Sequence, residues 1–127
     1  MTLFEECLAA LGSYKIVKLF EEKMALAQIK LTEYGRLDLK RYRSYRRITI
    51  PELQRLPDFS CYVIYDDAKL PVIKCRFKRV MECLDDVTAA SFDTWILSED
   101  YTKIIEFHHS GEINLVDGGG QFSGGLA

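Results

Sequence analysis

The sequence predicts an α+β fold, in which N-terminal helices pack on a mainly antiparallel sheet of about five strands ending in a three-stranded meander. The first third of the chain has apolar residues at helical spacing. The second half has short runs rich in β-branched and aromatic residues, separated by polar turns. At 127 residues, 48% of them hydrophobic, the chain is long enough to bury one core without disulfides or a structural metal ion.

The first helix is expected to begin after Thr2. Thr2 and Glu5 form a capping box, in which the hydroxyl and the carboxylate satisfy reciprocal backbone donors. Gly12 then supplies a stop. Residues 14–19 fit both a strand and a helical stripe, and both alternatives stay open. A second helix is predicted over residues 20–34, which are rich in Glu, Lys, Met, Ala and Leu.

The middle of the chain predicts a further helix and a hairpin. Thr49, Pro51 and Glu52 signal a helix start over residues 50–56. The elements expected next are a buried strand (61–65), a turn at Asp66-Asp67, a returning strand (71–77) and a short helical segment (79–84).

Residues 91–116 organise the chain, because they predict the meander that earlier elements would cover. A short glycine-containing loop between two β-rich runs is a hairpin signal. The runs are residues 92–97, 103–108 and 112–116. Residues 1–117 are therefore interpreted as a single domain. Residues 118–127, with five glycines in ten positions, are interpreted as a flexible tail, in part a cloning remnant.

Several features predict a cytoplasmic protein. No apolar run approaches the roughly 18 residues that cross a bilayer. The first residues include acids and no basic residue before the apolar positions, unlike a signal peptide. The cysteines are widely spaced within apolar patterns, which favours buried thiols over disulfides or a zinc site. They are Cys7, Cys61, Cys75 and Cys83.

Charge is distributed unevenly along the chain. Residues 1–47 hold ten Lys and Arg against six Asp and Glu, whereas residues 81–127 hold one Lys against nine acids. A basic partner would be steered to the C-terminal part. The basic segment 36–47, with interleaved Tyr42 and Tyr45, is compatible with nucleic-acid binding, and also with a solvated strand or loop.

No catalytic site, cofactor or metal site is predicted. His108 and His109 are adjacent, so on a strand they would face opposite sides of the sheet and could not share one metal. The carboxylate pairs at 66–67 and 85–86 are better explained as turn residues, which bond to the local backbone, than as hydrolytic sites. There is no glycine-rich phosphate loop between a strand and a helix.

What remains is a protein-binding surface on and beside the meander. Acids and aromatics mixed on a rigid sheet suit an interface that receives Lys and Arg. Trp95 and Tyr101 are the aromatic candidates, although Trp95 also fits a core position. The acidic candidates are Asp93, Glu99, Asp100 and Glu106, followed by Asp66, Asp67, Asp85 and Asp86.

Three segments carry a resemblance to a known family: YVIYDDAKLPVIK (62–74), LDDVTAASFDTWILSEDY (84–101) and IEFHHSGEINL (105–115), with weaker support from GRLDL (35–39). They resemble immunity proteins of bacterial contact-dependent growth inhibition systems, the CdiI type. The resemblance implies a non-enzymatic inhibitor that binds the toxic C-terminal domain of a CdiA-type partner, often a nuclease, and occludes its active site or substrate path. The alternatives are a small RNA-binding module using Arg36 to Arg47, a carboxylate-dependent enzyme, and a structural subunit that self-associates by a sheet edge.

Overall fold

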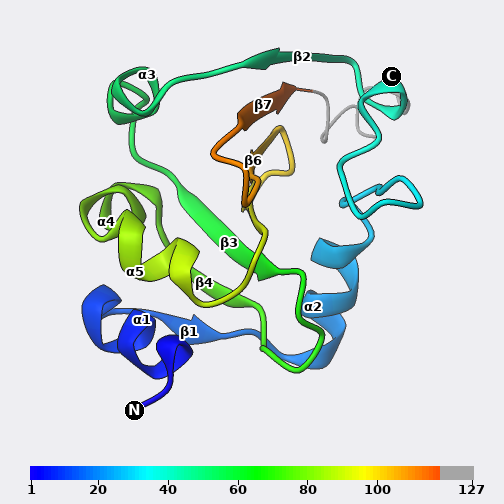
Figure 1. The fold of residues 1–127 in the computed structure, drawn as a ribbon. Helices are drawn as coiled ribbons and strands as arrows, with labels where there is room; N and C mark the ends of the chain where they lie inside the picture. The colour runs from blue at the N-terminus through cyan, green and yellow to red at the C-terminus, as the bar shows by residue number, and fades with distance from the viewer. Residues whose placement is uncertain (118–127) are drawn as a thin grey trace.

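The computed structural model describes residues 1–117, which form one antiparallel sheet with helices on both faces (Figure 1). The strands are β1 (Lys15–Ile16), β2 (Ser44–Arg47), β3 (Ser60–Tyr65), β4 (Ile73–Arg76), β5 (Thr94–Ser98), β6 (Lys103–Phe107) and β7 (Ile113–Asp117). The helices are α1 (Leu3–Leu11), α2 (Leu19–Leu26), α3 (Ile50–Gln54), α4 (Phe77–Glu82) and α5 (Leu84–Ala89), with a 3₁₀ turn, η1, at Leu39–Arg41. The predicted α+β class is confirmed. The tail predicted at 118–127 lies outside the described residues.

The sheet order is β1-β4-β3-β5-β6-β7-β2, so the predicted meander β5-β6-β7 and hairpin β3-β4 are both confirmed. Within residues 1–117 the sheet has seven strands instead of about five, because β1 and β2 extend it at its two edges. Both edge strands are exposed along their whole length. A strand without a buried face lacks the alternation by which strands are recognised in sequence. The sequence accordingly left residues 14–19 open between strand and helix, and residues 36–47 compatible with a solvated strand or loop, and the structure places β1 and β2 there.

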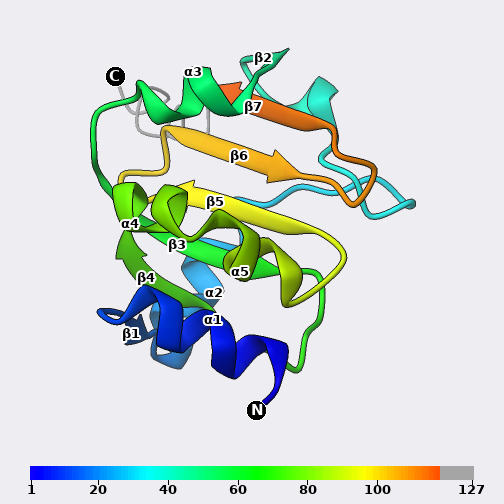
Figure 2. The ribbon, with the colours of Figure 1, turned by 60° about the vertical axis from the view of Figure 1, so that its left-hand side comes forward.

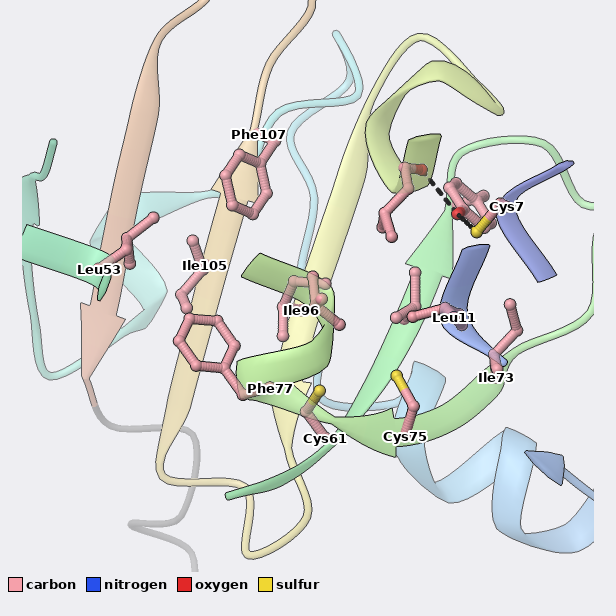
Figure 3. Close-up of a cluster of buried hydrophobic side chains, with 14 of the residues drawn as sticks. Cys7, Leu11, Leu53, Cys61, Ile73, Cys75, Phe77, Ile96, Ile105 and Phe107 are labelled. Atoms are coloured by element: carbon pink, nitrogen blue, oxygen red, sulfur yellow. Dashed lines mark hydrogen bonds between the residues drawn. The ribbon is translucent and has the colours of Figure 1, made fainter. Parts of the chain in front are cut away.

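Four helices cover the first face of the sheet: α1, α3, α4 and α5 (Figure 2). Figure 3 shows the core beneath them, where helix side chains meet Ile96 of β5 and Ile105 of β6. The largest helix contributions are Leu11, Leu53 and Phe77, each at most 1% exposed. Burial of one such side chain contributes roughly 1.5–3 kcal/mol, which fixes these short helices on the sheet.

The second face is covered by α2 and by the segment 27–43. Leu37 and Ala25 pack here against strand residues that include Ile64 and Ile104.

The predicted helix over residues 20–34 is too long, since α2 ends at Leu26. Tertiary contacts replace the missing helical turns. The Tyr42 hydroxyl donates to the Gln28 carbonyl (2.7 Å) and accepts from the Lys30 backbone N–H (2.7 Å).

Local sequence signals place the starts of two other helices, α1 and α3, correctly. Both predicted helix starts, at Thr2 and Thr49, are capping boxes in the structure, and Gly12 caps α1 with a φ of 73°. The α3 helix ends two residues before its predicted end, at Gln54. The segment predicted at 79–84 is two helices, α4 and α5, separated by Cys83.

All four cysteines are free thiols, as predicted. Cys7, Cys61 and Cys75 are buried, and Cys83 is half-buried. Burial raises the pKa of Cys7 and Cys83, so these thiols stay protonated near neutral pH. Among the described residues, no helix has the length and apolar character that a bilayer span requires.

Candidate functional site

The acidic residues that the sequence singles out fall at opposite ends of β5. Asp93 lies just before the strand, whereas Glu99 and Asp100 lie just after it, in the connection to β6. A five-residue strand with a rise of about 3.3 Å per residue separates its ends by roughly 16 Å. The expected acidic surface is therefore two surfaces, on the left and right of the sheet in Figure 2.

At one end, the carboxylate of Asp100 builds its own turn. Asp100 Oδ1 accepts hydrogen bonds from Ser98 Oγ (2.8 Å) and from the hydroxyl and backbone N–H of Thr102 (2.7 and 3.0 Å). The Thr102 hydroxyl is the main reason why the pKa of Asp100 lies below its ordinary value. Tyr101 completes the turn with a φ of 67°.

Glu99, beside it, is paired with a lysine of β4. Lys74 Nζ lies 2.5 Å from Glu99 Oε2 and 3.4 Å from Glu21 Oε2, which comes from α2. The Tyr62 hydroxyl donates to the same Glu21 oxygen at 2.6 Å and is the main cause of the lowered pKa of Glu21. Glu21 was not a sequence candidate, because no local pattern connects α2 with β4.

Beyond the other end of β5, Asp66 and Asp85 lie beside the turn formed by residues 91–93. Asp66 bonds to Ser91 and Asp93, and Asp85 lines a groove with Ser91 and Phe92. A second exposed aspartate follows each of them, Asp67 after β3 and Asp86 in the first turn of α5. In the part of the chain that the structure describes, none of these four carboxylates has a salt-bridge partner.

Hydrogen bonds hold this turn in place. Asp66 Oδ1 accepts from the Ser91 hydroxyl and from the Asp93 backbone N–H (3.2 Å). Asp67 Oδ1 accepts from the Lys69 backbone N–H at 2.9 Å, which is the local bonding expected of an aspartate in a turn. The predicted turn at Asp66-Asp67 is therefore confirmed.

Phe92 lies in the turn formed by residues 91–93, with 79% of its surface exposed. It lines an open groove of about 570 Å³ between α5 and the β6–β7 turn, together with Leu84, Asp85, Thr88, Phe107, His108, His109 and Ile113. An exposed aromatic ring beside an apolar groove and carboxylates has the composition of a partner-binding surface. We call Asp66, Asp67, Asp85, Asp86 and Phe92 the Phe92 surface.

Sequence reasoning missed Phe92 because it placed this residue inside the predicted strand 92–97. The strand begins two residues later, at Thr94, so Phe92 lies in the preceding turn. No signal in the sequence separates the two cases, since Phe is as favourable in a strand as it is at an interface.

Trp95 and Glu106 lie in the interior. For Trp95 this is the core position that the sequence also allowed, whereas for Glu106 it corrects the expectation that the carboxylate faces a partner. The two residues are 2% and 1% exposed. Trp95 Nε1 and the Leu37 backbone N–H both donate to Glu106 Oε2, at 3.1 and 2.8 Å. Arg36 Nη2 lies 3.1 Å from Glu106 Oε1. These contacts hold the segment 27–43 against β5 and β6, and this segment covers the face of the sheet on which a partner was expected.

The match to known families bears on the whole described chain. A family model described as "CdiI immunity protein EcoliA0-like" matches residues 1–116. The chain belongs to this family. Its members are immunity proteins, so the family supports a toxin-neutralising role and a toxin as the partner. A search of curated proteins finds no match.

In this CdiI-family chain, His108 and His109 lie close together, which corrects the prediction that they face opposite sides of the sheet. Strand β6 ends at Phe107, so both histidines belong to the β6–β7 turn, and their ring centroids are 4.0 Å apart. The alternation of side chains holds only within a strand. Both rings approach the carboxylate of Asp93, which is 9% exposed.

The basic segment 36–47 serves the fold. Arg46 lies 3.1 Å from Glu52, and Arg47 lies 3.3 Å from Glu112. Arg36 bridges Glu106 and Glu112 at 3.1 Å each. Half of the six basic residues in this segment thus neutralise the protein's own carboxylates. This pattern favours the structural alternative over the nucleic-acid-binding one.

Proposed function

We propose that this CdiI-family protein binds the toxic C-terminal domain of a CdiA-type protein in the cytoplasm of the toxin-producing cell. The toxin is a nuclease, and the protein inhibits it by occluding its active site or its substrate path, without chemistry of its own. The observation that carries the proposal is the Phe92 surface: an exposed aromatic ring and four exposed carboxylates on neighbouring segments, none of them in a salt bridge inside residues 1–117.

The charge of this surface suits a nuclease. An enzyme that holds a phosphate backbone presents Lys and Arg to it. Carboxylates without an internal salt bridge attract those cations over a distance comparable to the Debye length, about 8 Å at physiological salt. They also accelerate the encounter. Asp66, Asp67, Asp85 and Asp86 can therefore take the place of substrate phosphates.

Phe92 supplies the apolar anchor of the proposed interface. Binding energy usually concentrates in a few aromatic or Arg side chains surrounded by polar groups that exclude water. The groove beside Phe92 offers a complementary pocket for a side chain of the toxin. Burial of an exposed ring in a complex contributes several times more than a screened surface ion pair.

The Glu99 turn is a second, weaker contact region in the proposal. Glu99, Asp100 and Tyr101 lie in an exposed to half-exposed connection, but Lys74 and Thr102 already engage the two carboxylates. A toxin would have to compete with these internal contacts. The proposal assigns a structural role, and no toxin contact, to three of the candidates: Asp93, Trp95 and Glu106. Their buried side chains position the turn and the sheet.

The test is a binding titration against the product of the gene immediately upstream, with variants that leave the core intact. Asp85→Asn with Asp86→Asn should weaken binding, and Phe92→Ala should weaken it by more than about tenfold, as expected of an interface hot spot. The matched control is Glu33→Gln, an exposed carboxylate on the other face. Unchanged binding by both sets of variants would remove the Phe92 surface from the proposal while leaving the family assignment intact.

A further inference from the structure

Three side chains with metal-binding atoms converge where β5 begins and the β6–β7 turn passes. Asp93 Oδ1 lies 3.1 Å from His109 Nδ1 and 4.0 Å from His108 Nε2. One ligand atom from each residue can be chosen so that all three lie within 4.8 Å of one another. These three residues are not members of the Phe92 surface, but they adjoin it, since the His109 and Phe92 ring centroids are 5.6 Å apart and both histidines line the same groove.

The fold brings the three together through strand register and a tight turn. Thr94 pairs with Phe107, so Asp93 and His108 come next to each other just beyond the paired residues. Gly111, with a φ of 96°, then closes the turn, and its N–H donates to the His108 carbonyl at 2.9 Å. The His109 backbone N–H donates to Asp93 Oδ1 at 2.9 Å, which fixes the carboxylate against the turn.

We propose that Asp93, His108 and His109 bind a divalent transition-metal ion, with Zn²⁺ as the representative case. Two imidazoles and one carboxylate are a common three-ligand set for zinc, and a water molecule completes the tetrahedron. Zinc bonds of about 2.0–2.2 Å place tetrahedral ligand atoms about 3.4 Å apart. The present separations of 3.1 and 4.0 Å are close to that requirement.

Neighbouring groups orient the ligands. Ser110 Oγ lies 2.8 Å from His108 Nδ1, and in the metal-bound form Nδ1–H donates to this hydroxyl, which leaves Nε2 for the metal. The Ser110 backbone N–H lies 3.3 Å from the same Nδ1 and favours the opposite tautomer when no metal is bound. Metal binding therefore selects the His108 tautomer that donates from Nδ1 to Ser110 Oγ. On His109, the metal ion replaces the proton on Nδ1.

The electrostatic surroundings accept a cation. Asp93 contributes one negative charge, and Asp66 is near enough to accept a hydrogen bond from the Asp93 backbone N–H. The groove that both histidines line also contains Asp85, and its lining within residues 1–117 includes no Lys or Arg. The groove gives a hydrated ion access to the site and leaves room for the fourth ligand.

Such an ion would cross-link the start of β5 to the β6–β7 turn. A ligand that binds the folded protein and not the unfolded chain raises the thermal midpoint. The full-length protein should bind one Zn²⁺ in a competition titration with a chromophoric chelator. Addition of Zn²⁺ should raise its Tm, and Co²⁺ should give the visible absorption of a tetrahedral nitrogen and oxygen site.

Two variants and a control decide the origin of these signals. His109→Ala removes a half-exposed ring and His108→Ala removes its neighbour. Each should weaken Zn²⁺ binding by more than about tenfold, because even outer-shell losses cost about 10- to 100-fold. Cys83→Ser removes the most exposed thiol and should bind Zn²⁺ as the wild type does. Three results would each overturn the proposal. The first is no 1:1 binding at 100 μM Zn²⁺, roughly the weak limit for a specific site. The others are binding that both histidine variants retain and binding that Cys83→Ser loses.

Discussion

The buried carboxylate of Glu106 gives the sharpest stability prediction. Its two oxygens accept four hydrogen bonds: from Arg36 Nη2 (3.1 Å), Asn114 Nδ2 (3.3 Å), the Leu37 N–H (2.8 Å) and Trp95 Nε1 (3.1 Å). In Glu106→Gln, the amide NH₂ must face one of these two pairs of donors. At least two buried donors then lose their acceptor, and Arg36 loses its most buried counter-charge.

The magnitude follows from these losses. Each buried donor without an acceptor costs about 1–3 kcal/mol, and removal of one member of a buried ion pair costs about 3–5 kcal/mol in total. We therefore expect Glu106→Gln to lower the free energy of unfolding by about 3–5 kcal/mol, a large part of the about 5–15 kcal/mol that holds a domain of this size. Urea unfolding, followed by far-UV circular dichroism and by Trp95 fluorescence, measures it.

Glu112→Gln is the matched control, because Glu112 also contacts Arg36 and Asn114 but its side chain is 28% exposed. Water can replace its contacts, so the expected loss is below about 1 kcal/mol. If Glu106→Gln lost no more stability than Glu112→Gln, the four-donor account of Glu106 would be refuted. Toxin contact would then again be open as the role of Glu106.

Three further predictions concern the second face and the two acidic ends. Tyr42→Phe removes the hydroxyl bonded to Gln28 and Lys30 and should destabilise by about 1–2 kcal/mol in the same urea assay; an unchanged midpoint would contradict this. Asp100 has a folded pKa below its ordinary 3.8, so its carboxylate stabilises the fold above that pH. The difference in the free energy of unfolding between the wild type and Asp100→Asn should therefore shrink as the pH falls below 3.8. A difference that grows on acidification would contradict the lowered pKa of Asp100. Phe92→Ala should change the free energy of unfolding by less than about 0.5 kcal/mol, since the ring is exposed. A larger loss of stability would show that Phe92 belongs to the core.

Elements determined by neighbouring residues could be predicted from the sequence. Thr2 and Thr49 each bond to a glutamate three residues later, so both helix starts are visible in a four-residue window. The meander has the same character, since short turns join its strands and each strand is a short run rich in β-branched or aromatic residues. Sequence patterns carry this information because the interactions are local.

Elements determined by distant residues could not be predicted. Glu106 owes its burial to Arg36 and Leu37, about 70 positions earlier, and nothing near Glu106 distinguishes a buried carboxylate from an exposed one. The early end of α2 depends on Tyr42, which replaces helical hydrogen bonds from another element. Edge strand β2 forms only because β7 offers free backbone groups to it.

The candidate surface shows the same limit. The sequence identified the excess of acids in the second half but joined Glu99 and Asp93 into one surface, whereas a whole strand separates them. It also could not show that Lys74 neutralises Glu99 while Asp85 and Asp86 stay without a salt bridge in the described chain. Which carboxylates are available to a partner depends on ion pairs between elements far apart in sequence.

We propose that the Phe92 surface is the part of this protein that neutralises a cognate nuclease toxin. The most direct measurement is a nuclease assay of the upstream gene product, with wild-type protein and with the Asp85→Asn, Asp86→Asn, Phe92→Ala triple variant at equal concentration. We expect full inhibition by the wild type and recovery of nuclease activity with the triple variant, while Glu33→Gln inhibits as the wild type does. A toxin that binds the wild-type protein tightly but shows no nuclease activity to inhibit, or a triple variant that inhibits as well as the wild type, would contradict the claim.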